Sequence, residues 1–331
     1  MPSKLPLTLA CWDYDRTNAL LTGRVRAEGI ELNYLPMMMP EPAFRMLRHG
    51  EFDIAEMSLS WYARTVTQTS RPFIAIPVFP SRMFRHSCVY VNADSGIKEP
   101  EDLKGKRVGC PEYQMTAAVW LKGILADRHG VPVNSVGYLT GGLEQSGRTE
   151  TPMNLPADIR IEAIGPDQTL SAMLASGEID ALYTAHAPSS FTGDGEGPVR
   201  RLWSDPIAVE QHYFAETGIF PIMHVIVIRQ DVYEAHRWVA RSLMKAFEEA
   251  RDIARAELFE STALKTMLPW QPLWAEQSRA LLGGQFWPYG LRENEKVLDT
   301  FLRYSFEQGL SERRLAPEEL FAPETLDVAV I

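Results

Sequence analysis

Residues 46–53 read MLRHGEFD, and residues 173–180 repeat them as MLASGEID. In both copies, apolar residues at helical spacing run up to a glycine, the usual residue just after a helix. A short, mostly apolar run follows each glycine, at residues 53–57 and 180–183, as is typical of a strand. The repeat therefore predicts two similar units, each with a helix that ends at glycine and leads into a strand.

The sequence upstream of each copy supports this duplication. Residues 7–11 and 107–110 are apolar runs that predict strands, and polar segments that open helices follow at residues 12–17 and 111–116. Strands that alternate with helices indicate parallel βαβ units. The second copy carries a glycine-containing insertion around residues 140–156. We therefore expect an α/β protein of two lobes, with a mixed sheet in each lobe.

The two lobes are not expected to be consecutive in the sequence. Two apolar runs, residues 87–92 and 222–228, predict strands at which the chain crosses from one lobe to the other. Residues 94–221 would then form an inserted lobe two. Residues 1–93 and 222–331 would form lobe one, and a ligand cleft is expected between the lobes.

The tail of the chain is predicted to be helical. Apolar residues recur at helical spacing over residues 232–258 and again over 294–309, where the run ends at Gly309. We expect these extra C-terminal helices to cover lobe one and to supply the surface of a homo-oligomer.

Composition narrows the class of function. The chain has 331 residues, 45% of them hydrophobic and 23% charged, which suits two globular domains. Its formal net charge is -10, without a long basic run, which argues against nucleic acid or an anionic membrane as partner. A small anionic ligand would require arginine and histidine concentrated at one place.

The compartment is expected to be cytoplasmic. Pro6 interrupts the short apolar stretch near the first residue, so the pattern of a secretory signal is missing, and no apolar run reaches the length of a membrane span. Cys11, Cys88 and Cys110 lie in apolar settings without paired zinc spacing, so we expect reduced, buried thiols.

Two segments resemble type II periplasmic binding proteins. Residues 103–109 (LKGKRVG) resemble the opening of their second lobe, and Ser58-Leu59-Ser60 resembles the serine turn that lines their cleft. This resemblance implies the two-lobed fold but not an activity.

A narrower resemblance covers nearly the whole chain. The segments RMFRHS (82–87), GCPEYQMTA (109–117), GGLEQSGR (141–148), TGIFPIMH (217–224), WPYG (287–290) and EQGL (307–310) are similar to the 4,5-dihydroxyphthalate decarboxylase family. The resemblance implies a binding-protein fold that acts as an aromatic-acid decarboxylase in phthalate catabolism and forms protocatechuate and CO2. We expect the reaction to need no cofactor, because the electron-rich ring of such a substrate can itself assist the loss of CO2.

An aromatic dicarboxylate with two hydroxyl groups makes three demands on its site. Its carboxylates need donors, for which arginine is well shaped. The ring carbon that loses CO2 needs a proton, most commonly from histidine. A base on a catechol hydroxyl would push charge toward that carbon.

Arg82, Arg85 and His86 cluster just before the first predicted crossing strand. We predict that the arginines bind substrate and that His86 is catalytic, because such a cluster is unusual in an acidic protein. The alternative is a surface ion pair and a histidine satisfied by backbone groups.

Four polar residues precede or open the first helix of lobe two, where free N–H groups attract a carboxylate. Glu112 is predicted to act as the base on a hydroxyl group; the alternatives are a solvated Glu112 and a Thr116 that only caps the helix. The predicted substrate-binding residues here are Tyr113, Gln114 and Thr116.

Two further histidines complete the predicted catalytic set. His186 follows the strand of the second repeat, and His224 lies at the second crossing. A proton donor with an orienting partner is one interpretation of His86 and His224. A divalent metal bound by histidines and Glu112 is the minority alternative, because no local ligand spacing supports it.

The remaining predicted substrate contacts lie in loops. Arg148 belongs to the glycine-rich insertion, which is interpreted either as a mobile flap that brings Arg148 to a carboxylate or as a plain surface loop. The predicted contacts in lobe one are Trp12, Ser58, Ser60 and Trp61. Either tryptophan could stack on the ring or belong to the core.

Two other functions fit the same fold. One is a non-catalytic cytosolic protein that binds an aromatic acid, and the other is an enzyme acting on a menaquinone or pyrimidine precursor. A receptor would need ligand donors but no proton donor, so the histidines at both crossings favour the decarboxylase.

Overall fold

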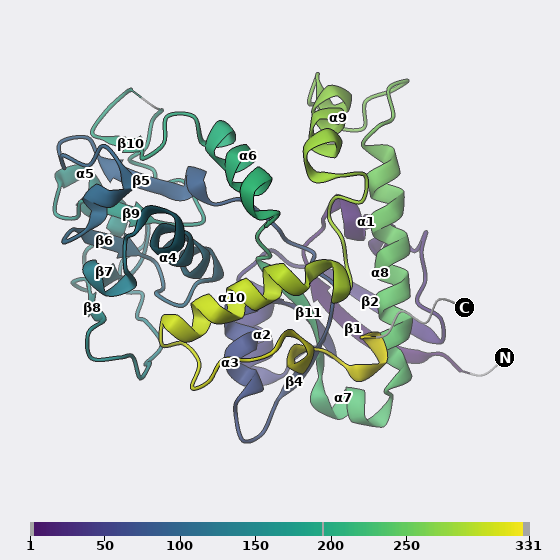
Figure 1. The fold of residues 1–331 in the computed structure, drawn as a ribbon. Coiled ribbons are helices and arrows are strands. Elements are labelled where there is room, and N and C mark those ends of the chain that lie inside the picture. The colour runs from purple at the N-terminus through teal and green to yellow at the C-terminus, as the bar shows by residue number, and fades with distance from the viewer. Residues whose placement is uncertain (1–2, 194, 327–331) are drawn as a thin grey trace. The chain divides into compact units, whose positions relative to one another are not determined.

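The computed structural model describes residues 3–193 and 195–326, which form two compact units (Figure 1). Unit 1 comprises the chain up to Arg82, Ile222–Asp299 and the chain from Leu315 onward. Unit 2 comprises Met83–Pro221 and Thr300–Arg314. Among the helices of the described residues, none has the length and apolar character that crossing a lipid bilayer requires.

The sheet of unit 1 has the strand order β2-β1-β3-β11-β4. Strands β2, β1 and β3 are parallel, whereas β11 is antiparallel to both of its neighbours. In Figure 1, strands from the beginning of the chain therefore lie beside β11, which comes from much later in the sequence. The strands are β1 (Leu5–Cys11), β2 (Ile30–Pro36), β3 (Ile54–Ser58), β4 (Phe73–Ile76) and β11 (His224–Arg229).

The sheet of unit 2 has the order β10-β5-β9-β6-β7-β8. Strands β9, β6, β7 and β8 are parallel, and β5 is antiparallel to β9 and β10. This is the arrangement of unit 1 with one more edge strand, as the repeat predicts. The strands are β5 (Val89–Asn92), β6 (Arg107–Cys110), β7 (Gly137–Thr140), β8 (Arg160–Ala163), β9 (Ala181–Tyr183) and β10 (Val199–Arg201).

The crossing strands divide the chain differently from the sequence-based boundaries. Residues 83–93, which were expected in lobe one, belong to unit 2, because β5 pairs with β9 and β10. Residues 300–314 also belong to unit 2 rather than to lobe one. Strand β5 fills in unit 2 the antiparallel position that β11 fills in unit 1.

Strand register gives a residue-by-residue correspondence between the units. Leu9 pairs with Ile54 in unit 1, and Val108 pairs with Ala181 in unit 2. Since the repeat aligns Ile54 with Ala181, Cys11 corresponds to Cys110. The loops that follow then align as CWDYDRT (11–17) and CPEYQMT (110–116), which share cysteine, an acidic residue, tyrosine and threonine at the same spacing.

Both helices of the repeat end as predicted. Helices α2 (Glu41–His49) and α5 (Leu170–Ser176) stop at Gly50 and Gly177, which adopt left-handed conformations. Each is followed by its predicted strand, β3 or β9. The other helices before β11 are α1 (Asp15–Leu21), α3 (Leu59–Val66), α4 (Thr116–His129) and α6 (Pro206–Thr217).

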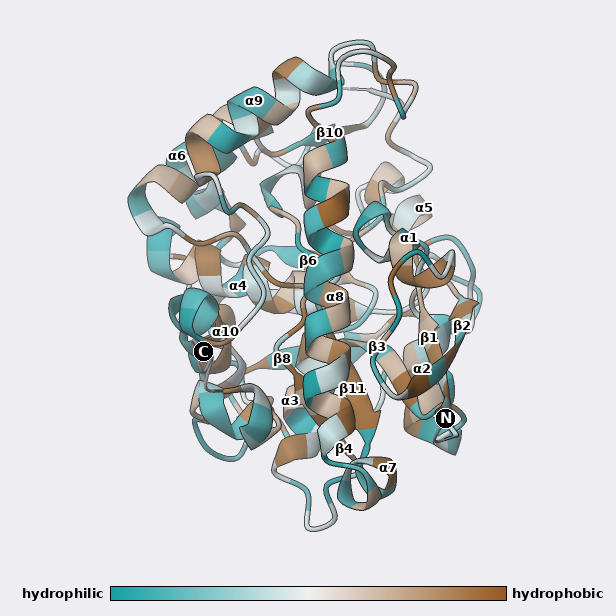
Figure 2. Cartoon of the chain, turned by 90° about the vertical axis from the view of Figure 1, so that its right-hand side faces the viewer, coloured by the Kyte–Doolittle hydropathy of each residue, from teal (hydrophilic) through white to brown (hydrophobic). Residues whose placement is uncertain are grey.

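The predicted helix over residues 232–258 is two helices. Helix α7 (Gln230–Ala235) ends at His236, whose backbone is not helical, and α8 (Trp238–Glu257) follows. The apolar face of α8 packs against α1, and Figure 2 shows this helix as a mixture of brown and teal, whereas strand β11 is largely brown. Helices α9 (Gln271–Leu282) and α10 (Glu295–Glu307) complete the tail.

Helix α4 is the central helix of unit 2, and α10 covers part of it. A Cβ atom at Gly123 would lie 2.2 Å from the ring of Tyr304, so only glycine allows this close approach. Trp120 contacts the rings of Phe301 and Tyr304, and Tyr304 donates a hydrogen bond to Asp127 (2.8 Å). These contacts explain why residues 300–314 belong to unit 2.

Candidate functional site

A buried carboxylate lies at the centre of unit 1. Glu56 is 0% exposed in the middle of β3, between apolar neighbours. Its Oε1 accepts a hydrogen bond from the Tyr14 hydroxyl (2.6 Å), and its Oε2 accepts one from the backbone N–H of Trp12 (3.0 Å). The thiol of Cys11 also donates to Oε2 (3.4 Å). The loop after β1 therefore surrounds this carboxylate with donors.

His224 lies beside the same carboxylate. It begins β11, where its backbone pairs with Ser58 at the end of β3, and its Nδ1 is 2.6 Å from Oε1 of Glu56. The histidine side chain is 19% exposed. The pairing of β11 with β3 thus places an imidazole, partly open to solvent, on a carboxylate that is completely buried.

The contacts of Glu56 determine its charge. Burial by itself would raise the pKa of Glu56, but the hydrogen bond and charge of His224 oppose burial, with help from Trp12 and Tyr14. The net result is a pKa below the usual value, so Glu56 is ionised at neutral pH. Burial and the charge of Glu56 raise the pKa of Tyr14, which therefore remains a donor.

Arg16 is held next to this centre by two aromatic rings. Its guanidinium lies 4.1 Å from the ring centre of Tyr14 and 4.2 Å from that of Trp287. The backbone of Trp287 has a φ of 67°, unusual for a residue other than glycine, and its indole N–H donates to the Phe79 carbonyl (3.0 Å). A planar cation oriented in this way suits a planar carboxylate.

Unit 2 has a polar cluster where β6 leads into α4. Arg148, from the glycine-rich insertion, forms an ion pair with Glu112 and is 38% exposed at its side chain. Glu150, from the same insertion, accepts a hydrogen bond from the backbone N–H of Tyr113 (2.7 Å). Burial and the charge of Glu112 raise the pKa of Glu150 to about 7. The insertion is therefore fastened to the start of α4 by two carboxylate contacts.

Lys122 lies beneath this cluster in α4. It is 2% exposed, and its ammonium group donates to the Tyr113 carbonyl (2.7 Å) above the tyrosine ring. Burial lowers its pKa to about 7.

His86 lies at the start of β5 within aromatic side chains. It is 1% exposed, and its ring centre is 5.2 Å from those of Trp203 and Tyr213. Burial and the charge of His129 lower the pKa of His86 to about 4, so the imidazole is neutral at neutral pH. Its Nδ1 is 3.9 Å from Glu210, beyond hydrogen-bond distance.

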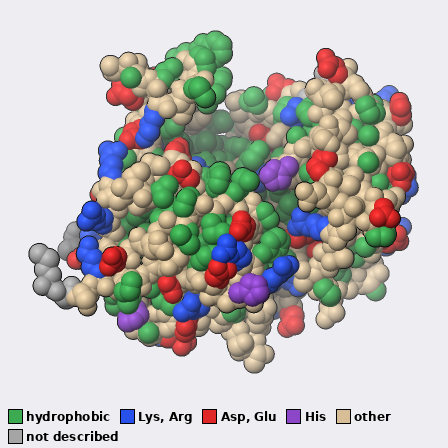
Figure 3. Space-filling view, turned by 180° about the vertical axis from the view of Figure 1, so that it is seen from behind, with side chains coloured by type: hydrophobic (Ala, Val, Ile, Leu, Met, Phe, Trp, Pro, Cys, Tyr) green, Lys and Arg blue, Asp and Glu red, His purple; other side chains and the backbone are tan. Residues whose placement is uncertain are grey.

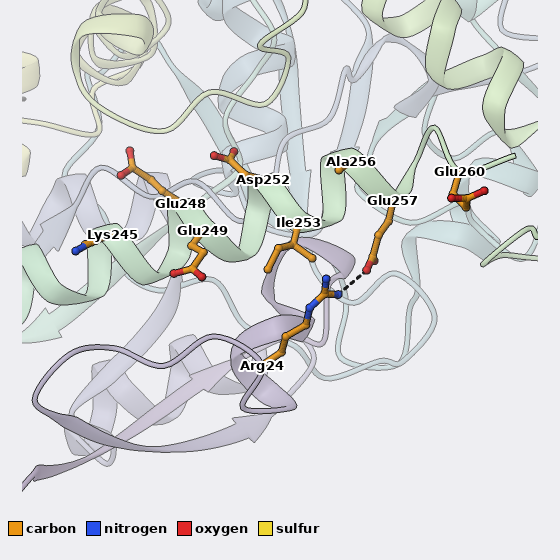
Figure 4. A pocket seen from close by; sticks show the side chains of 9 residues that line it. All are labelled: Arg24, Lys245, Glu248, Glu249, Asp252, Ile253, Ala256, Glu257 and Glu260. Atoms are coloured by element: carbon orange, nitrogen blue, oxygen red, sulfur yellow. Dashed lines mark hydrogen bonds and ion pairs between the residues drawn. The ribbon is translucent and has the colours of Figure 1, made fainter. Parts of the chain in front are cut away.

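A surface cavity of about 770 Å³ lies along α8, and none of these groups is among its lining residues (Figure 4). Five of its lining residues are acidic, and one of them, Glu257, pairs with Arg24 (2.7 Å). This chemistry does not suit a dianionic ligand. Figure 3 shows acidic and basic side chains interspersed over one face of the described residues, without a broad basic area.

Comparison with known proteins identifies the family. A 4,5-dihydroxyphthalate decarboxylase of Comamonas testosteroni is 40% identical over 326 residues, which cover 98% of each chain. The chain belongs to the 4,5-dihydroxyphthalate decarboxylase family. A second family member, from Pseudomonas putida, is 43% identical over 205 residues, 62% of this chain and 79% of that protein.

Other comparisons support the fold of this decarboxylase family member. The family described as NMT1/THI5 like matches residues 25–142. The periplasmic aliphatic sulphonate binding protein SsuA of Escherichia coli has a TM-score of 0.53 at 14% identity, covering 98% of this chain and 99% of that one. The alkanesulfonate-binding protein SsuA of Xanthomonas axonopodis also has a TM-score of 0.53, at 16% identity, covering 97% and 99%. These structures confirm the predicted two-lobed fold of periplasmic binding proteins.

The predicted catalytic residues of the decarboxylase lie in both units. His224 lies in unit 1, whereas His86, Glu112 and His186 lie in unit 2. His186 is exposed after β9, and its N–H donates to Thr184 (3.3 Å). Their catalytic roles, and the shared cleft, stay predictions.

The predicted substrate-binding residues differ in accessibility. Arg82 is buried in unit 1 and donates to Asn294 and to the Pro288 carbonyl, so it holds the segment before α10. Trp61 is partly exposed and packs edge-on against Phe44. Trp12 and Arg148 are exposed, and Ser58 is partly exposed. The others are buried: Ser60, Arg85, Tyr113, Gln114 and Thr116.

Several polar groups were missed by the sequence analysis. Glu56 and Lys122 are buried and Glu150 is partly exposed, and only the first two carry a signal in the sequence. Glu56 interrupts an apolar strand, and Lys122 interrupts an apolar stretch of α4. A charged residue within an apolar run that is otherwise buried needs a partner, so each could have been identified as a candidate.

Metal binding was the minority alternative. Across residues 3–193 and 195–326, no three histidine, cysteine or acidic side chains are grouped as ligands of one ion would be.

Proposed function

We propose that this chain removes one carboxylate from 4,5-dihydroxyphthalate, which yields protocatechuate and CO2. The observation that carries the proposal is the 40% identity with the C. testosteroni decarboxylase along 98% of both chains. The activity is that of a carboxy-lyase in phthalate catabolism.

The proton needed by the ring carbon comes, in this proposal, from His224. A hydroxyl group para to the departing carboxylate supplies electron density while the carbon accepts the proton. The bond between this carbon and the carboxylate then breaks, its electron pair restores the aromatic ring, and CO2 leaves. Solvent returns a proton to the imidazole. Histidine suits this step because it exchanges protons near neutral pH.

In this proposal, Arg148 and Glu112 assist at the other groups of the substrate. Arg148 is assigned to a carboxylate, for which it exchanges its ion pair with Glu112. Glu112 is then able to accept a proton from a catechol hydroxyl, which increases the electron density of the ring. Both side chains come from segments that meet at the start of α4.

The test is direct turnover. Purified protein is incubated with 4,5-dihydroxyphthalate, and protocatechuate and CO2 are measured over time. We expect equimolar formation of both products. A well-folded protein that binds the acid but forms neither product would contradict the proposal and would favour the second candidate, a non-catalytic binding protein, to which the fold shared with the SsuA proteins lends support.

We also propose that the reaction needs no cofactor. The electron-rich ring can accept a proton without a metal or an organic electron sink, and the protein supplies acid and base groups. The turnover assay with and without a chelator tests this. Loss of activity that is restored by a divalent metal would contradict it.

A cytoplasmic location is proposed as well. Cys11, Cys88 and Cys110 are buried free thiols, which suits a reducing compartment. Fractionation of cells of the source organism, with antibody detection of this protein, tests the location; recovery in the periplasmic fraction would contradict it.

We propose that the chain forms a homo-oligomer through the segment that holds α9. Residues 264–282 expose a run of large apolar side chains, and only Gln271 and Ala275 of α9 are buried. Figure 3 shows hydrophobic side chains gathered on this segment at the upper edge. An exposed apolar patch is a common mark of a protein interface. Its members are Leu264, Met267, Leu268, Trp270, Leu273, Trp274 and Leu281.

A further inference from the structure

The two units are built alike, but at matching strand positions unit 1 has a buried carboxylate within hydrogen-bond distance of an imidazole, and unit 2 has neither group there. In the strand register, Glu56 corresponds to Tyr183, since Ile54 aligns with Ala181. Glu56 pairs across the sheet with Ile226, and Tyr183 pairs with Val89. His224 therefore corresponds to Ser87. Unit 2 forms the same sheet with a tyrosine and a serine at these places, so the fold itself does not require the charged pair.

A buried ionised group is costly to place in a protein interior unless it is well paired, so its presence in one copy needs a reason. Oε1 of Glu56 accepts from Tyr14 at 2.6 Å and faces Nδ1 of His224 at 2.6 Å. Oε2 accepts from the Trp12 N–H and the Cys11 thiol. Each contact is one in which the carboxylate accepts.

These contacts determine which ring nitrogen of His224 carries a proton. An ionised carboxylate has no proton to donate, so Nδ1 must donate to it. The remaining nitrogen, Nε2, lies on the opposite edge of the ring and is the one that can exchange a proton with a bound molecule. Histidines that work as acids or metal ligands are commonly oriented by a carboxylate in this way.

We propose that Glu56 is the positioning residue of the reaction: it holds the His224 ring with Nδ1–H toward itself and so directs Nε2 to the substrate. This inference rests on the proposed function, in which His224 supplies the proton. Glu56 itself does not touch the substrate. Tyr14 and the Trp12 N–H hold the carboxylate in turn.

The variant Glu56→Gln gives a sharp test because the surrounding donors fix how glutamine must lie. The Trp12 N–H requires an acceptor, so the amide oxygen takes the place of Oε2. The amide NH2 then takes the place of Oε1 and donates to Nδ1 of His224. The proton of the neutral ring must then lie on Nε2, and the doubly protonated ring, which is the form that donates a proton from Nε2, loses the carboxylate that stabilises it. We expect kcat to fall by up to about 10⁴-fold, the loss seen when the orienting carboxylate of a catalytic histidine becomes an amide, while KM changes by less than about threefold.

The tautomer can be measured without any assay of activity. The protein has seven histidines, so a sample with ¹⁵N-labelled histidine is compared with a His224→Asn sample to assign the His224 signals. The neutral ring of the native protein should carry its proton on Nδ1, and that of Glu56→Gln should carry it on Nε2. A native ring protonated at Nε2 would overturn the inference, even if Glu56→Gln were too unstable to study.

Glu248→Gln is the matched control. Glu248 lies on α8 of the same unit, is partly buried, and lines the cavity along that helix. The same change there should leave both kcat and the His224 tautomer as they are in the native protein. If the native protein shows no turnover at all, the proposed function fails, and the tautomer measurement still decides the placement of His224. If turnover is present and Glu56→Gln keeps the native kcat, the positioning role is refuted.

Discussion

The ammonium group of Lys122 lies 3.0 Å from the ring centre of Tyr113 and donates a hydrogen bond to the carbonyl of the same residue. Tyr113 thus supplies both a π face and a carbonyl to the buried ammonium group. Burial lowers its pKa from 10.5 to about 7.

This shift predicts a pH dependence of stability. Between pH 7 and 10.5 the unfolded chain binds a proton that the folded chain has released, so the free energy of unfolding rises with pH. Between pH 7 and 9, we expect the free energy of unfolding of native protein to rise relative to that of Lys122→Met, by up to about 1.4 kcal/mol per pH unit. Urea unfolding at several pH values measures this. The control is Lys245→Met, a change at an exposed lysine of α8, whose free energy of unfolding should depend on pH as that of native protein does. The same pH dependence for Lys122→Met would contradict the prediction.

His86 predicts a change at acid pH. Its folded pKa of about 4 lies below the ordinary 6.5, so the unfolded chain binds the extra proton between these values and stability falls as the pH decreases. We expect His86→Phe to lose less stability than native protein between pH 6.5 and 4, as measured by urea unfolding.

His86 also carries a prediction about activity, because it was predicted to be catalytic. Turnover of His86→Ala should fall far more than substrate affinity. An unchanged turnover would remove His86 from the catalytic residues.

Arg148 predicts an effect on substrate binding. If it exchanges Glu112 for a substrate carboxylate, Arg148→Ala should raise KM by about tenfold or more, in line with the loss of a charge-assisted hydrogen bond. The control is Arg24→Ala, which removes another arginine paired with a glutamate. Steady-state kinetics with both variants decide the matter, and equal KM values would exclude Arg148 from the site.

Gly123 predicts a packing effect in unit 2. A Cβ atom there would meet the Tyr304 ring at 2.2 Å, so Gly123→Ala should lower the free energy of unfolding by about 1–3 kcal/mol, as overpacked cores do. Gly137→Ala is the control, since its nearest neighbour would be 3.8 Å away. Equal denaturation midpoints for the two variants would show that α10 does not press on α4 as described.

The apolar residues of α9 predict an assembly. We expect Trp274→Glu to reduce the mass measured by light scattering, because a charge would disfavour burial of this face. Glu276→Gln, within the same helix, should retain the native mass. A native protein that is already monomeric would refute the interface.

The sequence predicted the architecture because its signals are local. A helix that ends at glycine and leads into an apolar run is readable at residues 46–58 and again at 173–183, and both copies fold as expected. The pairing partners of the crossing strands could not be predicted in the same way. The residues 87–92 do not by themselves indicate that this strand pairs with β9 and not with strands of unit 1, because pairing depends on distant parts of the chain.

The same distinction applies to the site. His224 was predicted from its place at a crossing, whereas its carboxylate partner was overlooked in a strand that comes 168 positions earlier. Arg82 was expected to bind substrate because it lies near His86, but its guanidinium contacts Asn294 and Pro288. Proximity in the sequence therefore indicates which residue types are near one another, but it does not predict the contacts that their side chains make.

The use of residues 300–314 as a cover for α4 also affects how the chain is made. Trp120 and Gly123 are synthesised long before Phe301 and Tyr304, which pack against them. The apolar surface of α4 therefore stays uncovered while the rest of Met83–Pro221 and the Ile222–Asp299 part of unit 1 are synthesised. The core of unit 2 is therefore completed only near the end of translation. Nascent chains truncated before α10 should depend most on chaperones.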